Sequence, residues 1–239
     1  VDAVGGISRV RYESAHPRLL TPELVEAHAT LPTLCEHLHL PVQSGSNRVL
    51  DRMGRGHGRE DFLQWIERAR AASPGIGLST DLVVGFPGER ERDFDDTLSL
   101  VEASRFDSAF TFKYSPRPGT GAALMADDVP PETKADRLAR LQSLQARITA
   151  ENLASMVGSE VEVLIEGSSK AGGGQLSGRT RRNTVVNVDV AAEGPGAQRA
   201  GRDIEPLLGE MLTVAVVEAG GHSLRARPVV RDVGHGPGG

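Results

Sequence analysis

The alternation of strand-like and helix-like segments between residues 7 and 114 constrains the fold of this chain more than any other feature. Short apolar runs alternate with segments whose apolar residues recur at helical spacing. Repeated β-α units with apolar strands predict a parallel sheet covered by helices, with ligands bound at the carboxyl ends of the strands. The strands are expected at 7–14, 36–42, 77–86 and 107–114, and the helices at 21–30, 59–72 and 89–104.

Four strands make only part of a closed barrel and leave a bare parallel edge beside residue 7. We therefore expect the chain to be incomplete at its N-terminus. Residues 1–125 are then the C-terminal part of a (β/α) barrel, and residues 126–157 are a linking amphipathic helix. The fold class at this stage is α/β, with a partial barrel.

The composition changes after this helix. Short β-rich runs separated by Gly-rich turns predict a second, small antiparallel β-barrel of the OB-like kind at 158–230. The final residues, 231–239, are rich in glycine and are expected to form a disordered tail.

The segment "PVQSGS" at 41–46 ends an apolar strand in a polar loop. Gln43, Ser44 and Ser46 can donate and accept hydrogen bonds, so this loop is suited to the polar groups of a nucleoside-like ligand. The alternative is that Ser46 is the N-cap of a helix starting in "NRVLDRM", and both roles are compatible.

The segment "STDLVVGFPGE" places Asp81 inside an apolar strand that ends in a Gly-rich loop before Glu89. An acid in such a strand needs a hydrogen-bond partner or a ligand to offset its desolvation. A glycine such as Gly85 lets the backbone approach a flat ligand closely, although for one such loop taken alone an ordinary tight turn is the favoured interpretation. The loop matches neither a Walker loop nor a dinucleotide fingerprint.

The loop "YSPRPGT" at 114–120 contains Tyr114 and Arg117. An arginine in a rigid loop suits recognition of a carboxylate or phosphate, while an exposed surface arginine is an equally good reading of this loop alone. His37 and His39 alternate with leucines and share one face of their strand. Without a third ligand nearby, we assign them no metal.

A basic cluster occurs in the second half of the chain. A cluster of this kind can neutralise RNA phosphates, but it is also typical of a solvated edge that discourages strand pairing. The cluster consists of Lys170, Arg179, Arg181 and Arg182. On a short strand, alternation would send Arg179 and Arg181 to one face, which is then the face expected to contact RNA, and Arg182 to the other.

Composition limits the functional classes. The formal net charge of −5 argues against non-specific coating of nucleic acid but allows a local basic face. Cys35 is the only cysteine, so a disulfide or a three-cysteine iron–sulfur site cannot be completed within these residues. The sequence contains no signal peptide and no run of apolar residues long enough for a membrane span, so a cytoplasmic protein with no membrane partner is expected.

Taken in order, four segments resemble the radical SAM methylthiotransferase family, most closely its tRNA-modifying branch. They are "CEHLHLPVQSGSNRVLDRMGRGH" at 35–57, "STDLVVGFPGERERDFDDTL" at 79–98, "FDSAFTFKYSPRPGT" at 106–120 and "LSGRTRRNTVVN" at 176–187. The second barrel is similar to the TRAM domain of that family, an RNA-binding module. The resemblance extends from about residue 7 to the end of this barrel.

The resemblance implies methylthiolation at C2 of an N6-isopentenyladenosine beside the tRNA anticodon. It implies S-adenosylmethionine and two [4Fe-4S] clusters as cofactors, and the anticodon stem-loop and an electron donor as partners. The residues it implies for cofactor binding are Gln43, Ser44, Asp81, Gly85, Glu89, Tyr114 and Arg117. The cysteines that hold both clusters in the family are missing here, so we expect this chain alone to be inactive.

Two alternatives remain at this stage. One is a non-catalytic RNA-binding protein in which a degenerate barrel supports the TRAM domain. The other is the relative that modifies an aspartate of a ribosomal protein, for which we expect a loop different from "PVQSGS" and a less RNA-like small barrel.

Overall fold

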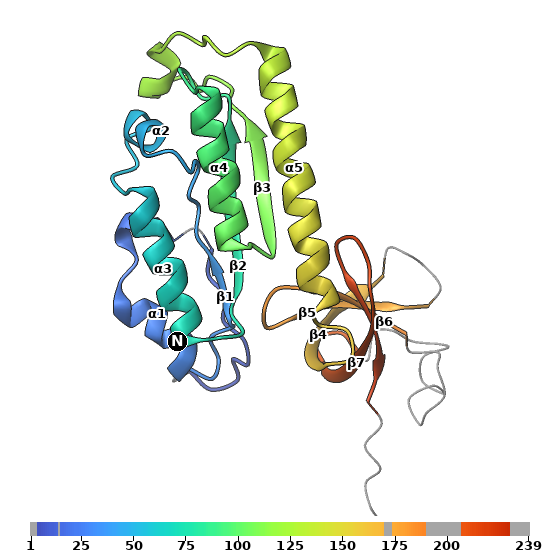
Figure 1. The fold of residues 1–239 in the computed structure, drawn as a ribbon. Helices are drawn as coiled ribbons and strands as arrows, with labels where there is room; N and C mark the ends of the chain where they lie inside the picture. The colour runs from blue at the N-terminus through green and yellow to red at the C-terminus, as the bar shows by residue number, and fades with distance from the viewer. Residues whose placement is uncertain (1–3, 14, 170–173, 190–206, 230–239) are drawn as a thin grey trace, which may run out of the picture. The chain divides into compact units, whose positions relative to one another are not determined.

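The computed structural model describes residues 4–13, 15–169, 174–189 and 207–229 (Figure 1). These residues form two compact units, 1–151 and 152–239, and each unit has its own hydrophobic core. The tail expected at 231–239 lies outside the described residues.

The first unit contains a three-stranded parallel sheet with the order β1-β2-β3 (Figure 1). Its strands are β1 (His37–His39), β2 (Gly77–Val84) and β3 (Ser108–Lys113). The helical segments are η1 (Pro17–Leu19), α1 (Pro22–Thr30), α2 (Asn47–Arg52), α3 (Arg59–Ala72), α4 (Glu91–Ser104), η2 (Gly121–Leu124) and α5 (Pro131–Ala154).

The strand predicted at 7–14 is wrong. Only Val10 pairs there, in an isolated parallel bridge with Leu34, through hydrogen bonds of 2.7 Å to Thr33 O and 2.9 Å from Cys35 N. A strand needs a neighbour along its whole length. The segment before β1 provides one at a single position, so the described sheet has three strands and not four.

One side of the sheet carries the core of this unit. Leucines of β1 and β2, such as Leu38 and Leu82, alternate along the strands and pack against the helices. Phe62 of α3 and Phe94 of α4 are fully buried in this layer, which explains the apolar stripes seen in their sequences. Leu141 of α5 joins the same core.

The second unit is a closed five-stranded barrel with the order β4-β5-β6-β8-β7. Five β-rich runs of the sequence form its strands, and each contains buried side chains that alternate with partly buried or exposed ones. One neighbouring pair, β6 with β8, is parallel, so the expectation of a wholly antiparallel barrel is corrected at that pair. The strands are β4 (Glu160–Ser168), β5 (Leu176–Thr180), β6 (Val185–Val188), β7 (Met211–Ala219) and β8 (Leu224–Pro228).

Candidate functional site

The side of the parallel sheet opposite the core carries polar side chains. Ser79 Oγ lies 3.0 Å from His37 Nε2 and 2.9 Å from His39 Nδ1. His39 Nε2 in turn lies 3.5 Å from Asp81 Oδ1. The partner expected for the strand carboxylate is therefore a histidine, while 28% of the Asp81 side chain stays exposed and open to a ligand.

Aromatic rings lie beside Asp81 on the same side. β2 and β3 pair Asp81 with Phe110 and Val83 with Phe112, and directly paired residues point to the same side of a sheet. Phe110 is 59% exposed and Phe112 is 51% exposed. The Phe110 ring meets His39 edge-on, at 6.0 Å between ring centres. Exposed aromatic rings beside a few placed polar groups offer a surface on which a flat, partly polar ligand can pack.

Gln43 is held next to Asp81 by the backbone. Its N–H donates to Asp81 O at 2.9 Å and its carbonyl accepts from Val83 N at 2.9 Å, which continues the pairing of β1 with β2. Gln43 has a φ of 77°, a left-handed conformation that is uncommon for a residue with a side chain. The structure therefore joins the backbones of Gln43 and Asp81, two of the expected site residues.

Ser44 and Ser46 lie on the helix side. Ser44 is fully buried, and its Oγ lies 3.3 Å from Thr97 Oγ1 of α4. Ser46 Oγ donates to Asp93 Oδ1 at 2.7 Å and accepts from Val49 N at 3.5 Å. Ser46 is thus the N-cap of α2, as expected, and Ser44 does not face the same space as Asp81.

Gly85 and Glu89 are joined by a hydrogen bond in the loop after β2. The Gly85 N–H donates to Glu89 Oε2 at 2.6 Å, and the same oxygen accepts from Arg137 Nη1 at 2.9 Å. Burial raises the pKa of Glu89 above its usual value, although the Gly85 N–H and Arg137 oppose this. The Glu89 carboxylate therefore ties the strand end to α5.

Tyr114 is linked to the same loop through Lys134 of α5. The Lys134 ammonium lies 5.2 Å from the centre of the Tyr114 ring and 2.6 Å from Asp127 Oδ1. The Tyr114 hydroxyl donates to Ala122 O at 2.8 Å. Arg117, in contrast, is exposed in the next loop, and the structure does not bring it to the other expected residues.

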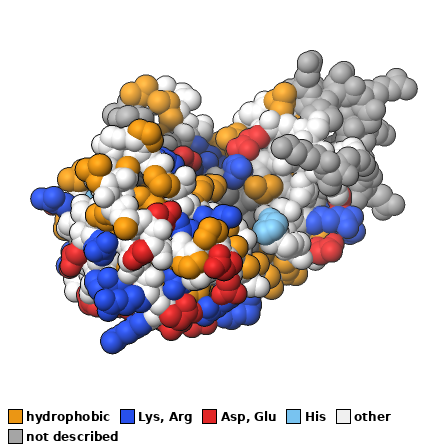
Figure 2. Space-filling model, turned by 90° about the horizontal axis from the view of Figure 1, so that it is seen from above, with side chains coloured by type: hydrophobic (Ala, Val, Ile, Leu, Met, Phe, Trp, Pro, Cys, Tyr) orange, Lys and Arg blue, Asp and Glu red, His pale blue; other side chains and the backbone are white. Residues whose placement is uncertain are grey.

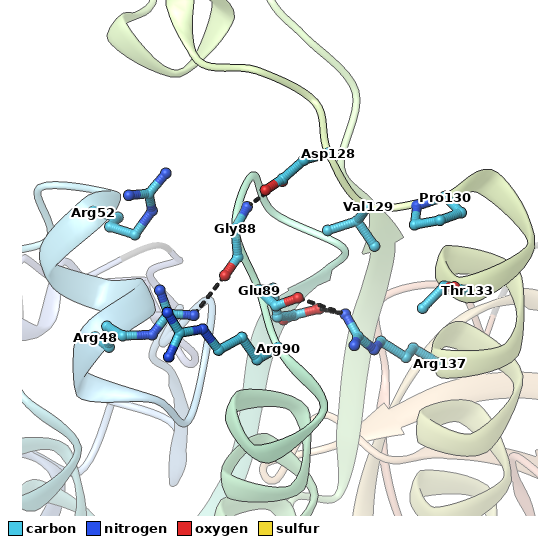
Figure 3. A pocket seen from close by; sticks show the side chains of 10 residues that line it. All are labelled: Arg48, Arg52, Gly88, Glu89, Arg90, Asp128, Val129, Pro130, Thr133 and Arg137. Carbon is cyan, nitrogen blue, oxygen red and sulfur yellow. Dashed lines mark hydrogen bonds and ion pairs between the residues drawn. The ribbon is translucent and has the colours of Figure 1, made fainter.

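A pocket lined by arginines was missed by the sequence reasoning. It has a volume of about 520 Å³ and lies between α2, the loop after β2 and the start of α5 (Figure 3). The arginines come from segments far apart in the chain, so their spacing in the sequence gives no signal. The lining residues are Arg48, Arg52, Gly88, Glu89, Arg90, Asp128, Val129, Pro130, Thr133 and Arg137.

In the small barrel, Arg179 lies on β5 and is paired with an acid. Its Nε lies 3.3 Å from Glu166 Oε2 of β4, and its Nη1 donates to Asn183 O at 3.1 Å. β5 ends at Thr180, so Arg181 and Arg182 lie in the following turn. Strand alternation therefore does not place Arg181 on the face of Arg179, which corrects that expectation. Lys170 lies outside the described residues.

Together, a parallel sheet covered by helices and a closed five-stranded barrel define a two-unit protein that joins an α/β unit to a small β-barrel. Residues 4–101 match the Radical SAM superfamily, and residues 154–229 match the TRAM domain.

Named relatives agree with both matches. The tRNA-2-methylthio-N(6)-dimethylallyladenosine synthase of Moorella thermoacetica is 54% identical over 186 residues, 78% of this chain and 42% of the relative. The synthase of Methylococcus capsulatus is 47% identical over 227 residues, 95% of this chain and 47% of the relative. The chain spans about half the length of the curated relatives it matches. It belongs to the radical SAM family of these synthases.

A solved structure, the coproporphyrinogen III oxidase of Escherichia coli, which is described as a radical SAM enzyme, matches with 21% identity and a TM-score of 0.48. The match covers 56% of this chain and 31% of that one.

Within the described ranges, no helix has both the length and the apolar composition needed to cross a bilayer.

The residues of this chain fit one cofactor of the superfamily but not the other. The polar and aromatic face of Asp81, His39 and Phe110, with the Gln43 backbone beside it, fits a nucleoside-like cofactor such as S-adenosylmethionine. An iron–sulfur cluster does not fit, because it needs several thiolates and Cys35, the single cysteine, is 1% exposed. In the described part of the chain, no group of three or more His, Cys, Asp or Glu residues is arranged to hold a metal ion.

Proposed function

We propose that this chain is part of a radical SAM enzyme that methylthiolates C2 of N6-isopentenyladenosine beside the anticodon of tRNA. The observation that carries this proposal is the order of the two parts: the Radical SAM match is followed by the TRAM match, and relatives named for this product align across both. Its partners are then a tRNA anticodon stem-loop and an electron donor, in the cytoplasm.

In this proposal, the sheet face around Asp81 binds S-adenosylmethionine. The Asp81 carboxylate accepts hydrogen bonds from the cofactor, Gln43 supplies a polar group beside it, and Phe110 packs on an apolar part. When bound, S-adenosylmethionine supplies the radical chemistry of the superfamily. Gly85, Glu89 and Tyr114 shape the strand end, and Ser44 positions the loop through Thr97.

The lone buried cysteine favours a second candidate, a non-catalytic RNA-binding protein. Both candidates bind RNA, so RNA binding alone does not separate them. Recognition of the isopentenyl group does, because an enzyme must bind the modified adenosine that it acts on, whereas a general binder reads mainly the phosphate backbone.

The test is therefore a comparison of two synthetic anticodon stem-loops that differ only in the isopentenyl group on the adenosine. Binding to the 239-residue chain is measured with and without S-adenosylmethionine. The proposed function expects tighter binding of the isopentenylated stem-loop, and S-adenosylmethionine binding that does not depend on RNA. Equal affinities, together with no S-adenosylmethionine binding, would support the non-catalytic binder.

A further inference from the structure

The arginine-lined pocket contains more positive charge than its own carboxylates neutralise. Four arginines and two acids line it. Arg137 is buried and pairs with Glu89 at 2.9 Å. Arg48 pairs with Asp93, its Nε donating to Asp93 Oδ1 at 3.2 Å. These two arginines hold the loop in place and are already compensated.

The two remaining arginines have no such partner. Arg52 and Arg90 are exposed, and within the described part of the chain neither guanidinium forms an ion pair with a carboxylate. Asp128 is the second acid of the lining, and its Oδ1 accepts from Gly88 N at 2.6 Å. In Figure 3, Arg48 and Arg90 extend toward the same region beside Gly88, from α2 and from the start of α4.

The position of Arg52 is built into the loop. Its Nε donates to Pro87 O at 3.1 Å, and its guanidinium lies where a side chain on Gly88 would be, 3.2 to 3.3 Å from an ideal Cβ. Gly88 also has a φ of 76°, so both the backbone conformation and the nearby guanidinium favour a glycine at this position. Arg52 therefore lies flat on the loop, where one of its outer nitrogens, Nη2, also donates weakly to Met125 Sδ at 3.9 Å, a contact that a charged phosphate oxygen can displace.

The N-terminal ends of two helices add to the positive electrostatic potential in the pocket. Both α4 and α5 begin at this pocket, with Arg90 as the N-cap residue of α4 and Pro130 just before α5. The N-termini of helices carry partial positive charge and unpaired N–H groups, which favour anions. A volume of about 520 Å³ lies within the roughly 300–1,000 Å³ typical of ligand pockets.

We propose that Arg52 and Arg90 bind a phosphate group in this pocket. Arginine forms paired hydrogen bonds with phosphate oxygens, and both of these arginines line the pocket, one from α2 and one from the N-cap of α4. The phosphate is either a backbone phosphate of RNA or a free phosphate-bearing ligand. The RNA source rests on the proposed function, whereas the phosphate site itself does not.

The experiment uses the 239-residue chain and compares the Arg52→Gln/Arg90→Gln double variant with Arg68→Gln. Arg68 is an exposed arginine on α3 that stacks on Trp65, so its variant removes one positive charge outside the pocket and is matched in charge to the Arg90→Gln single variant. The Arg90→Gln single variant is also measured, so that the proposal can still be tested if the double variant fails to fold. Binding of a fluorescent RNA stem-loop and of inorganic phosphate is measured at several salt concentrations.

Loss of the two arginines should weaken binding about tenfold or more, since each charge-assisted hydrogen bond is worth about 1.5–3 kcal/mol. With RNA as the source, the slope of log affinity against log salt should also fall by about 1 to 2. An effect on phosphate alone, with RNA binding unchanged, identifies a free phosphate ligand. Arg68→Gln should leave both unchanged.

The proposal is overturned if the double variant binds both RNA and phosphate like the wild type. That result leaves the proposed function standing, because recognition of the isopentenyl group is measured separately. If the wild type ignores the isopentenyl group but its phosphate binding depends on Arg52 and Arg90, the proposed function fails and the phosphate site stands.

Discussion

Lys134 occupies the space in which a side chain of Gly85 would lie. An ideal Cβ on Gly85 would come within 2.3 Å of Lys134 Cγ, much closer than carbon atoms approach in proteins. The conformation of Gly85, with a φ of 72°, also disfavours any residue with a Cβ. The glycine expected to let a ligand approach the backbone thus makes room for a lysine of α5.

Gly85→Ala should therefore destabilise the chain by about 2–4 kcal/mol, because it adds a backbone cost to overpacking. Urea unfolding at pH 7 measures this. Gly54→Ala is the matched control, since Gly54 has a φ of 67° with nothing within 4 Å of its Cβ position, and it should cost only about 1 kcal/mol. Equal costs for the two variants would show that the Lys134 contact contributes nothing.

Local patterns predicted most of the fold. β2, β3 and the five strands of the small barrel follow alternation or apolar runs, and the N-cap Ser46 follows from its place before α2. The segment predicted as a strand at 7–14 has the same pattern, but a neighbouring segment pairs with it only at Val10, and no local pattern reveals this.

The site was less predictable than the fold, because several of its residues come together only in the folded chain. Gln43 and Asp81 follow from the rule that strand ends converge. Arg52 and Arg90 reach the pocket, and Lys134 reaches Gly85, only through the tertiary fold, and arginines and lysines in or beside a helix usually indicate nothing more than a solvated face. Figure 2 shows why charge content was uninformative: on the face seen there, Lys and Arg side chains lie among Asp and Glu side chains.

Asp93 should make stability fall in acid. Burial alone would raise its pKa, but hydrogen bonds from Arg48, Ser46 and the Arg90 N–H outweigh burial and lower the pKa to about 2. A carboxyl with a lowered pKa stabilises the fold above its unfolded pKa of 3.8, and this stabilisation is lost as the pH falls toward 2.

Asp93→Asn should accordingly cost about 1–2 kcal/mol at pH 7, after allowance for solvent screening near the pocket mouth, and much less near pH 2. Chemical unfolding at pH 7, 4 and 2.5 follows this change. Asp51→Asn, at an exposed position on α2, serves as the control. A cost that is the same at every pH would mean that the charge of Asp93 is not the cause.

Asp81→Asn should weaken S-adenosylmethionine binding about tenfold, since it removes the charge from an acceptor but keeps its shape. Calorimetric titration of the 239-residue chain measures the affinity, and binding of an RNA stem-loop should be unchanged. Asp51→Asn again serves as the control. Parallel losses for cofactor and RNA would indicate misfolding, not loss of a cofactor contact.

Reconstitution with iron and sulfide should give no stoichiometric [4Fe-4S] cluster. One cysteine cannot replace three thiolate ligands, and Cys35 is buried in the core of the first unit. Visible absorption and iron analysis after desalting are the measurements, and Cys35→Ser should give the same result as the wild type. A cluster band that disappears in Cys35→Ser would contradict this prediction.

The last prediction concerns the competition between Glu166 and RNA for Arg179. Arg179 is partly exposed on β5, and Glu166 on β4 is 3.3 Å away, so a phosphate must displace this carboxylate to reach the guanidinium. Arg179→Ala should lower the slope of log affinity against log salt by about 1 for any stem-loop sequence. Removal of the competing carboxylate should instead tighten RNA binding.

Glu166→Gln should tighten RNA binding, because Arg179 then meets the phosphate without losing an ion pair. Glu210→Gln is the matched control, since Glu210 is exposed in the same barrel unit and the variant makes the same change in net charge. If both variants tighten binding equally, the gain comes from net charge alone and Arg179 has no special contact. If Glu166→Gln tightens binding only while Arg179 is present, as tested in the Glu166→Gln/Arg179→Ala double variant, the two residues form a switchable RNA contact.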